Sequence, residues 1–192
     1  MIFTPRMQKA VRFMVKTHEV YQKQKRKGKD IPYLTHPFTA GLILAKAGAH
    51  EDVVIAGLLH DTMEDSLDHK KVTHEMLEER FGKPVADLVQ SVSEPVKDAG
   101  WAERKQAALG HIAFFSHESV LVKSADVLSN TVELLDDYAA DGEATFERFN
   151  AGKTQILERT QKVVAALLAA WPESPLAEDL RTLSQDVAKM AD

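Results

Sequence analysis

Apolar residues recur at a helical period along nearly the whole chain, and no segment shows the strict alternation of apolar and polar residues that is typical of a half-buried strand. The gaps between the periodic segments are short, as they are in compact helical domains. We therefore expect an all-α fold, a single compact bundle of roughly eight to ten helices. The pattern predicts helices over residues 4–25, 38–46, 51–63, 73–80, 85–92, 101–115, 119–138, 144–171 and 176–190.

Two polar segments interrupt this helical pattern. The first is the loop 23–30, which carries five lysine and arginine side chains, and the second is the segment 93–100. A proline also follows His36 directly, and it restricts the residue before it to extended geometry. We therefore expect His36 in a loop, before a helix that begins at Phe38.

Composition narrows the class of protein. A chain of 192 residues is expected to form one domain over residues 1–192, and its apolar fraction of 44% is typical of globular proteins. The net charge of −5 argues against a nucleic-acid partner, and no apolar run is long enough to span a membrane. The chain has no cysteine, which excludes disulfides and thiolate metal ligands and makes a reducing cytoplasm the expected location.

The segment 58–65 carries four ionisable side chains directly after an apolar turn. His60 and Asp61 stand side by side, and the carboxylates of Glu64 and Asp65 follow at helical spacing. Residues four apart share one face of a helix, so each carboxylate is expected above one member of the His-Asp pair. Burying such groups without partners is costly. Because a divalent metal is the most economical partner for an imidazole beside a carboxylate, this segment predicts a metal site.

Two residues outside that segment are further candidate ligands. His36 is directed by the proline that follows it, and Asp126 lies in the otherwise apolar stretch 121–130, where a carboxylate needs a specific partner. Taken singly, His36 could be a surface or capping residue, and Asp126 could pair with the lysine three residues before it. Together with the His-Asp pair they make two imidazoles and two carboxylates, a set that suits Mn²⁺, Fe²⁺ or Zn²⁺ better than Ca²⁺.

The order of these motifs resembles the HD-domain metal-dependent phosphohydrolases. The His-Asp pair alone is typical of that superfamily. The two carboxylates after it, and the spacing from an Arg-Lys pair to a His-Pro pair, resemble more narrowly the small stand-alone alarmone hydrolases and the hydrolase domain of the bifunctional alarmone synthetase/hydrolases. The resemblance covers about residues 8–170 and leaves the predicted C-terminal helix at 176–190 outside it. It rests on residues 17–18, 26–27, 32–37, 56–65, 81–85, 103–105 and 121–126.

The resemblance implies an HD-type helical bundle that binds one divalent metal ion, with Mn²⁺ the expected metal. The ligands that it implies are His36, His60, Asp61 and Asp126. Glu64 and Asp65 would handle the attacking water and its protons, because a nearby carboxylate can accept the proton of a metal-activated water. The implied reaction converts ppGpp or pppGpp to GDP or GTP plus pyrophosphate. The alternative for both carboxylates is a solvated helix end.

The resemblance also implies contacts to a nucleotide substrate. Arg26 and Lys27 match an Arg-Lys pair that contacts the guanine nucleotide, and the alternative is that they belong to a solvated loop. Asn130, one turn beyond the last ligand, matches an asparagine that faces the nucleotide. Lys123 and Lys105 are candidates for phosphate contacts, with a surface lysine as the alternative for Lys123. No aromatic residue interleaves with the charges of the loop, which disfavours nucleic acid as its ligand.

The chain departs from the family pattern around the nucleotide. Val127 stands where a basic residue is usual, Ser129 where histidine or tyrosine is usual, and residues 156–157 where some relatives have a tyrosine. Residues 148–153 supply polar groups that either contact a second phosphate or only begin a helix. These departures do not affect the predicted metal ligands, but they leave undecided which nucleotide base the protein binds. A phosphohydrolase for another nucleotide, such as an adenine-based alarmone, and an inactive metal-bearing nucleotide sensor therefore remain alternatives, and the oligomeric state stays open.

Overall fold

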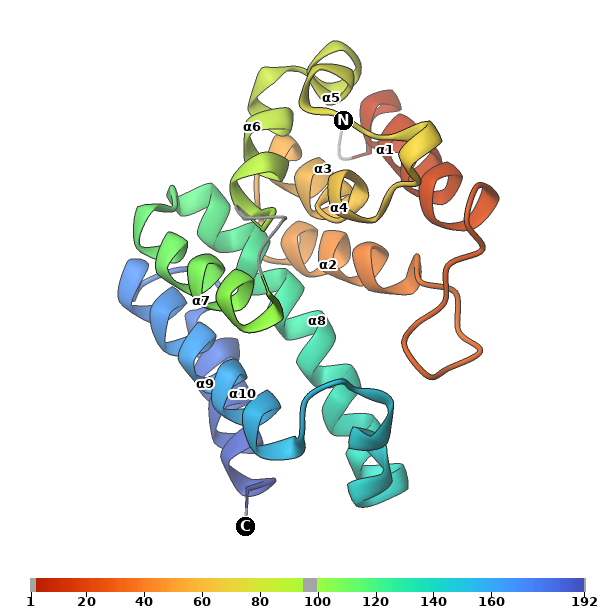
Figure 1. The fold of residues 1–192 in the computed structure, drawn as a ribbon. Coiled ribbons are helices and arrows are strands. Elements are labelled where there is room, and N and C mark those ends of the chain that lie inside the picture. Colours follow the sequence, from red (N-terminus) through yellow and green to blue (C-terminus); the bar gives the residue numbers. More distant parts are fainter. Residues whose placement is uncertain (1–2, 95–99, 192) are drawn as a thin grey trace.

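The computed structural model describes residues 3–94 and 100–191, and within these ranges it contains helices and loops but no β-strand, so the predicted all-α class is confirmed (Figure 1). Only an isolated bridge between Lys25 and Pro32 has β pairing there. The α-helices are α1 (Pro5–Val15), α2 (Thr35–Lys46), α3 (Glu51–Leu59), α4 (Thr62–Asp65), α5 (His74–Phe81), α6 (Lys83–Val92), α7 (Trp101–His111), α8 (His117–Asp141), α9 (Lys153–Ala170) and α10 (Ala177–Lys189).

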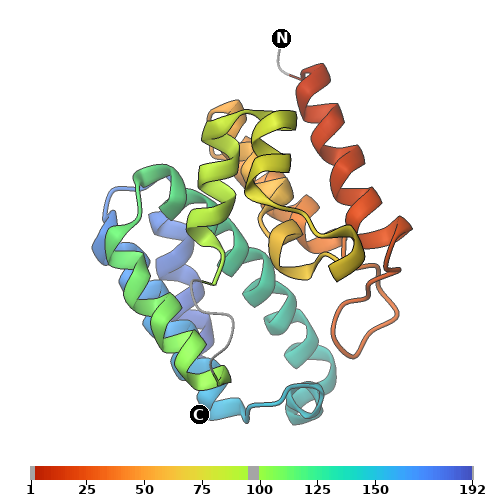
Figure 2. The ribbon, with the colours of Figure 1, turned by 45° about the horizontal axis from the view of Figure 1, so that its top comes forward.

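The long helix α8 lies between two groups of helices. Helices α2, α3 and α6 pack against it on one side, and α9 and α10 pack against it on the other (Figures 1 and 2). Every residue of α3 from Val53 to Leu59 is buried, as the apolar run in the sequence predicts. The larger cluster of buried apolar side chains extends from α1 to α10, and a smaller cluster lies around Leu134, Phe146 and Val187.

Helices α2 and α3 approach each other closely at two glycines. A Cβ atom on Gly41 would lie only 2.6 Å from Leu58, and one on Gly57 would overlap Leu44. The absence of both side chains lets the backbones meet, because packed interiors leave no room for an extra methyl group. This contact places the start of α2 beside the end of α3, where His36 and His60 lie.

The prediction of one helix over residues 51–63 is wrong, because the chain turns between α3 and α4. His60 and Asp61 form this turn. The ring nitrogen Nδ1 of His60 bonds to the carbonyl of Gly57 at 2.8 Å, and the hydroxyl of Thr62 donates to the carbonyl of Leu59 at 2.7 Å. Side chains thus satisfy carbonyls at the end of α3 that a continuing helix would have satisfied with backbone N–H groups.

The placement of His36 in a loop is also wrong. Helix α2 begins at Thr35, and His36 and Pro37 both lie in its first turn. The N–H groups of a first turn have no partner within the helix, so a proline costs little there. His36 is therefore held by a helix, and its side chain is buried.

Two other predicted helices are shorter than expected. The segment predicted over 4–25 ends its α-helix at Val15 and continues as a π-helical turn, Lys16–Val20, which carries the fully buried His18. The segment predicted as one helix over 144–171 is divided: a 3₁₀-helix spans Gly142–Arg148, with Phe146 in the smaller apolar cluster, and α9 begins only at Lys153.

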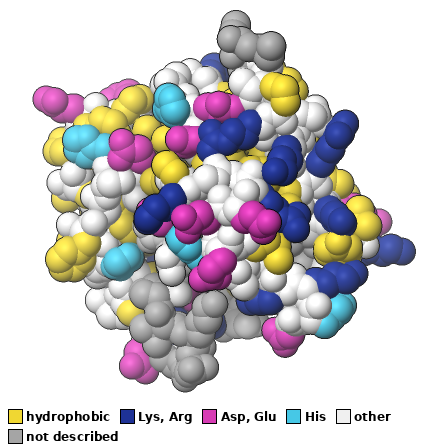
Figure 3. All heavy atoms as spheres, turned by 90° about the horizontal axis from the view of Figure 1, so that it is seen from above, with side chains coloured by type: hydrophobic (Ala, Val, Ile, Leu, Met, Phe, Trp, Pro, Cys, Tyr) yellow, Lys and Arg dark blue, Asp and Glu magenta, His cyan; other side chains and the backbone are white. Residues whose placement is uncertain are grey.

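The remaining predicted helices are present with ends shifted by a few residues. Within the predicted polar break at 93–100, residues 95–99 lie outside the described residues. None of the described helices combines the length and the apolar character that a membrane crossing requires. On the face that contains α1 and α5, acidic and basic side chains are interspersed (Figure 3).

Candidate metal centre and substrate cavity

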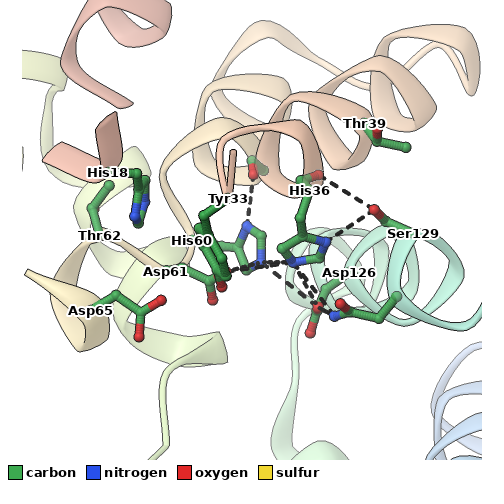
Figure 4. A network of polar contacts seen from close by, with 12 residues as sticks. His18, Tyr33, His36, Thr39, His60, Asp61, Thr62, Asp65, Asp126 and Ser129 are labelled. Carbon is green, nitrogen blue, oxygen red and sulfur yellow. Dashed lines mark hydrogen bonds and ion pairs between the residues drawn. The ribbon is translucent and has the colours of Figure 1, made fainter. Parts of the chain in front are cut away.

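Three elements bring two histidines and two aspartates together. His36 comes from the first turn of α2, His60 and Asp61 from the turn between α3 and α4, and Asp126 from the middle of α8 (Figure 4). The Nε2 atoms of His36 and His60 are 3.1 Å apart. Oδ2 of Asp61 lies 3.4 Å from the first of these atoms and 3.2 Å from the second. Oδ1 of Asp126 lies 3.3 Å and 3.7 Å from the same two atoms.

The outer hydrogen bonds of the two histidines define which ring nitrogen carries a proton. Nδ1 of His60 faces the carbonyl of Gly57, which only accepts, so this nitrogen is the donor. Nδ1 of His36 lies 3.0 Å from the hydroxyl of Ser129, which itself donates to the carbonyl of His36. In the neutral rings both Nε2 atoms then direct lone pairs at each other. Lone pairs this close repel unless a cation or a proton lies between them.

The cluster fits a divalent metal ion. Nitrogen and oxygen ligands at about 2.1 Å from one ion lie roughly 3.0–3.4 Å apart in octahedral or tetrahedral geometry, close to the spacings observed here. His36, His60 and Asp126 offer ligand atoms that all lie within 4.8 Å of one another. Asp61 adds the oxygen that contacts both imidazoles. The donor set is therefore chemically and geometrically suited to such an ion.

Charge within the cluster is strongly coupled. Burial would raise the pKa of Asp126, but Lys123 and the two imidazoles outweigh burial and hold this pKa well below its usual range. Burial would lower the pKa of His60, but Asp61 and Asp126 outweigh it and raise the pKa well above its usual value. The carboxylates thus stabilise positive charge at Nε2, the position that a cation would share.

Groups around the cluster hold the carboxylates in place. The hydroxyl of Tyr33 donates to Oδ2 of Asp61 at 2.5 Å. Lys123 donates to Oδ2 of Asp126 at 2.7 Å, and Asn130 donates to its Oδ1 at 2.7 Å. The helix-internal ion pair considered as an alternative for Asp126 is therefore present, and it occupies the oxygen that faces away from the imidazoles.

Two cavities adjoin the cluster, a larger one of about 600 Å³ and a smaller one of about 240 Å³. Glu64 and Asp65 face different ones. Glu64 lies beside the cluster in the smaller cavity and accepts a bond from the backbone N–H of Glu94 at 2.7 Å. Its side chain stays open to solvent, yet partial loss of hydration raises its pKa above the usual range. Asp65 lines the larger cavity, where burial and the charge of Asp61 raise its pKa and the amide of Gln24 donates to it at 2.9 Å.

The two cavities extend from the cluster and adjoin each other. The smaller one contains His60, Asp61 and Glu64. Each substrate-contact residue expected from the sequence lies on the wall of the larger one: Arg26, Lys27, Lys105, Lys123 and Asn130. The residues shared by both walls are Lys105, Lys123, Asp126, Asn130, Arg159 and Val163.

The basic loop 23–30 is anchored to α8 and is not a freely solvated loop. Arg26 pairs with Glu133 at 2.9 Å and donates to Asn130 at 2.7 Å. Lys29 pairs with Glu133 at 2.7 Å and with Asp137 at 2.5 Å. Much of the positive charge that the sequence shows in this loop is therefore neutralised by the helix behind it.

The sequence predicts that residues 148–153 either contact a phosphate or only begin a helix, and the structure places some of them at the larger cavity and others away from it. Arg148 and Asn150 line the larger cavity together with Phe149, whose ring lies 5.6 Å from the ammonium group of Lys27. Lys153 does not line it and instead pairs with Glu143 at 2.6 Å.

Sequence reasoning missed three residues of the site: Tyr33, Gln24 and Arg159. The first two act through contacts to Asp61 and Asp65 from the far side of a loop, and no periodic pattern identifies such contacts. Arg159 did leave a signal, since it stands between Ile156 and Val163 at the helical spacing of an inward-facing stripe.

Comparison with known protein families gives a match of residues 10–153 to the HD domain family. The chain is 41% identical over 105 residues to the guanosine-3′,5′-bis(diphosphate) 3′-pyrophosphohydrolase MESH1 of Danio rerio. The matched segment covers 54% of this chain and 56% of that protein. It is 35% identical over 119 residues to the MESH1 protein of Xenopus tropicalis, with 60% and 64% covered. The matched part thus spans less than two thirds of the length of either relative.

Two solved structures share the fold. A metazoan ortholog of SpoT that hydrolyses ppGpp superimposes with a TM-score of 0.73 over 98% of this chain and 94% of that chain, at 23% identity. The protein lmo0812 of Listeria monocytogenes EGD-e superimposes with a TM-score of 0.72 over 81% of this chain and 97% of that chain, at 28% identity.

Proposed function

The chain belongs to the HD domain family, and from this premise we propose that it is a metal-dependent phosphohydrolase that removes the 3′-pyrophosphate of guanosine polyphosphate alarmones. One observation carries the proposal: two imidazoles and two carboxylates converge beside two cavities whose shared wall carries lysine and arginine side chains. The MESH1 relatives, named as hydrolases of this linkage, support the substrate class.

In this proposal His36, His60, Asp61 and Asp126 hold one divalent ion, and Mn²⁺ suits their mixed nitrogen and oxygen donors. When bound, the ion neutralises charge on a phosphate oxygen and makes water a better nucleophile. Tyr33, Lys123 and Asn130 keep the two aspartates oriented, as the hydrogen bonds to their oxygens indicate.

The proposed reaction is the attack of water on the phosphorus joined to the 3′-oxygen of the nucleoside. Glu64 accepts a proton from the water, a role for which its raised pKa is suited. The bond between phosphorus and the 3′-oxygen breaks, and that oxygen leaves with the electron pair. Asp65 donates a proton to it, and the proton taken up by Glu64 passes through solvent to restore Asp65. The products are pyrophosphate and GDP from ppGpp, or GTP from pppGpp.

Arg26, Lys27 and Asn130 would bind the nucleoside part in the larger cavity. Glu133 and Asn130 hold the guanidinium of Arg26 in place, and one of its faces lies over the ring of Tyr33, 5.6 Å from the ring centroid, so a base would stack on the opposite face. An adenine-based alarmone is the second candidate substrate. Ile156 lines this cavity and offers no hydrogen bond that would distinguish the two bases.

A substrate screen tests the proposal. The protein supplied with Mn²⁺ is incubated with ppGpp, pppGpp, their adenine analogues and common nucleotides, and the products are identified by mass spectrometry. We expect pyrophosphate together with GDP or GTP. Hydrolysis of the adenine analogues alone would favour the second candidate, and nucleotide binding without any turnover would favour a sensor.

A further inference from the structure

One face of α9 forms a wall of both cavities. Ile156, Arg159, Thr160 and Val163 line the larger cavity, and Arg159 and Val163 also line the smaller one. Their spacing of three and four residues places them on a single face of the helix. Arg159 is the charged member of this face, and it lies where the two cavities meet.

Arg159 differs from the other cations on the shared wall in its contacts to neighbouring side chains. Lys105 pairs with Glu94, and Lys123 pairs with Asp126 at 2.7 Å. Among the described residues, no hydrogen bond and no ion pair within 4.0 Å holds the guanidinium of Arg159. Its side chain is open to the cavities, so its five N–H donors are available to a ligand.

The electrostatic setting of Arg159 favours an anion. Loss of hydration lowers its pKa, and the more distant charges of Asp126 and Glu94 offset only part of this, yet an arginine remains protonated at neutral pH. The smaller cavity contains four carboxylates. With a divalent ion held by the cluster, the positive charges of that ion, Lys105, Lys123 and Arg159 outnumber them. The cavity is then attractive to a compact polyanion.

We propose that Arg159 binds the terminal phosphate of the 3′-diphosphate and thereby makes the enzyme select a 3′-diphosphate over a 3′-monophosphate. This inference rests on the proposed function. The proposed reaction requires the phosphorus that is attacked to lie between the proposed metal ligands and Glu64, in the smaller cavity, and Arg159 lies on the wall that this cavity shares with the larger one. A guanidinium binds two phosphate oxygens with parallel hydrogen bonds, which gives directional recognition of the second phosphate.

Binding of inorganic pyrophosphate tests this role without any turnover. Calorimetry compares pyrophosphate with orthophosphate on the Mn²⁺-loaded wild type, Arg159→Gln, Arg159→Lys and Lys162→Gln. Lys162 lies on the same helix, is exposed and lines neither cavity, so it controls for loss of one charge. Metal chelation by pyrophosphate is the same for every variant, so the differences between variants are informative.

We expect Arg159→Gln to weaken pyrophosphate binding by about tenfold or more, to leave orthophosphate binding little changed, and to be partly rescued in Arg159→Lys. In kinetics, Arg159→Gln should reduce kcat/KM for ppGpp more than for the analogue with a 3′-monophosphate. If Arg159→Gln matches Lys162→Gln in both measurements while ppGpp is still hydrolysed, the inference is wrong and the proposed function stands. The opposite result is also informative. If the wild type hydrolyses no alarmone, but Arg159→Gln selectively weakens the binding of pyrophosphate, the phosphate assignment stands and the proposed substrate is wrong.

Discussion

The two ring nitrogens of each histidine in the cluster have separate tasks. Nδ1 of His60 is bonded to a backbone carbonyl and Nδ1 of His36 to the hydroxyl of Ser129, so both Nε2 atoms are directed at the same point. Such outer hydrogen bonds fix the tautomer and the ring orientation of metal-binding histidines. The hydroxyl of Ser129 thereby supports the ring of His36.

Asp61→Ala should abolish stable metal binding. The substitution removes the carboxylate oxygen that contacts both imidazoles, so the site loses one proposed ligand atom and one negative charge. Mass spectrometry of metal content should show near loss of Mn²⁺, and the rise in Tm that Mn²⁺ produces in the wild type should disappear. Asp179→Ala, an exposed change on α10, is the matched control and should retain both. Full metal occupancy in Asp61→Ala would exclude this aspartate as a ligand.

Glu64→Gln should separate metal binding from turnover. The amide keeps the shape of the side chain but cannot accept a proton, and a positioned acid or base contributes about 10²–10⁴-fold to a rate. We expect unchanged metal content and a fall in kcat of that order, measured with saturating ppGpp. An undiminished rate would reduce Glu64 to a structural partner of the Glu94 backbone.

Helix α8 organises most of the site along one of its faces. Lys123, Asp126, Asn130, Glu133 and Asp137 follow one another at spacings of three and four residues. The first three act on the cluster, and the last two anchor the basic loop. One helix thus sets the distance between the proposed metal ligands and the loop that would bind the nucleotide.

Glu133→Gln should weaken substrate binding through the loop. The change removes the carboxylate that pairs with Arg26 and Lys29, so the loop is held to α8 more weakly, by the contacts to Asn130 and Asp137 that remain. We expect KM for ppGpp to rise by about fivefold, equivalent to about 1 kcal/mol, with metal content unchanged. Asp136→Asn removes an exposed charge from the same helix and should behave as the wild type. A lower KM in Glu133→Gln would show instead that Glu133 competes with the substrate for Arg26.

At the scale of the whole molecule, the site is built where separate packing layers meet. The close contact of α2 with α3 at two glycines places the histidines, and the packing of both helices on α8 adds the aspartate. The π-helical turn after α1 packs the fully buried His18 against Tyr33, with ring centroids 5.0 Å apart. The N-terminal segment thus contacts Tyr33, whose hydroxyl donates to Asp61 of the cluster.

His18 should make the stability of the metal-free protein sensitive to acid. Burial lowers its pKa, and the bond to Gln24 and the charges of Asp61 and Asp65 offset this only in part. Above about pH 6.5 the histidine is neutral in both the folded and the unfolded chain. Below it the unfolded chain takes up a proton first, so the free energy of unfolding falls by up to about 1.4 kcal/mol per pH unit until the lower folded pKa is reached.

Urea unfolding of the chelator-treated protein between pH 7 and pH 5 measures this slope. His18→Gln should lose stability less steeply than the wild type on acidification, whatever its stability at pH 7. His50→Gln, which replaces an exposed histidine, should keep the wild-type slope. The raised pKa values of Glu64, His36 and His60 act in the opposite direction in every variant. The pKa of Asp65, by contrast, is itself lowered by the charge of His18, so the comparison measures His18 together with its coupling to Asp65. Equal slopes in all three proteins would remove His18 from the pH response.

From the sequence alone one can predict the all-α class, the apolar run that becomes the buried part of α3, and the residue types that meet in the cluster. Helical periodicity is a property of neighbouring residues, and the cost of burying an unpaired carboxylate or imidazole holds in any fold, so both can be inferred without coordinates. The order of His36, the His-Asp pair and Asp126 along the chain was sufficient to predict which side chains the structure brings together.

How these residues are held, and which neighbours they have, depends on the packing of the folded chain. The turn at His60 exists because a side chain takes over a backbone partner, and α2 begins before His36 because a first turn tolerates proline. The anchoring of Arg26 joins residues 107 positions apart in the sequence, and the position of Arg159 depends on how α9 packs against α8. Such contacts are set by the packing of distant segments, and no local pattern in the sequence encodes them.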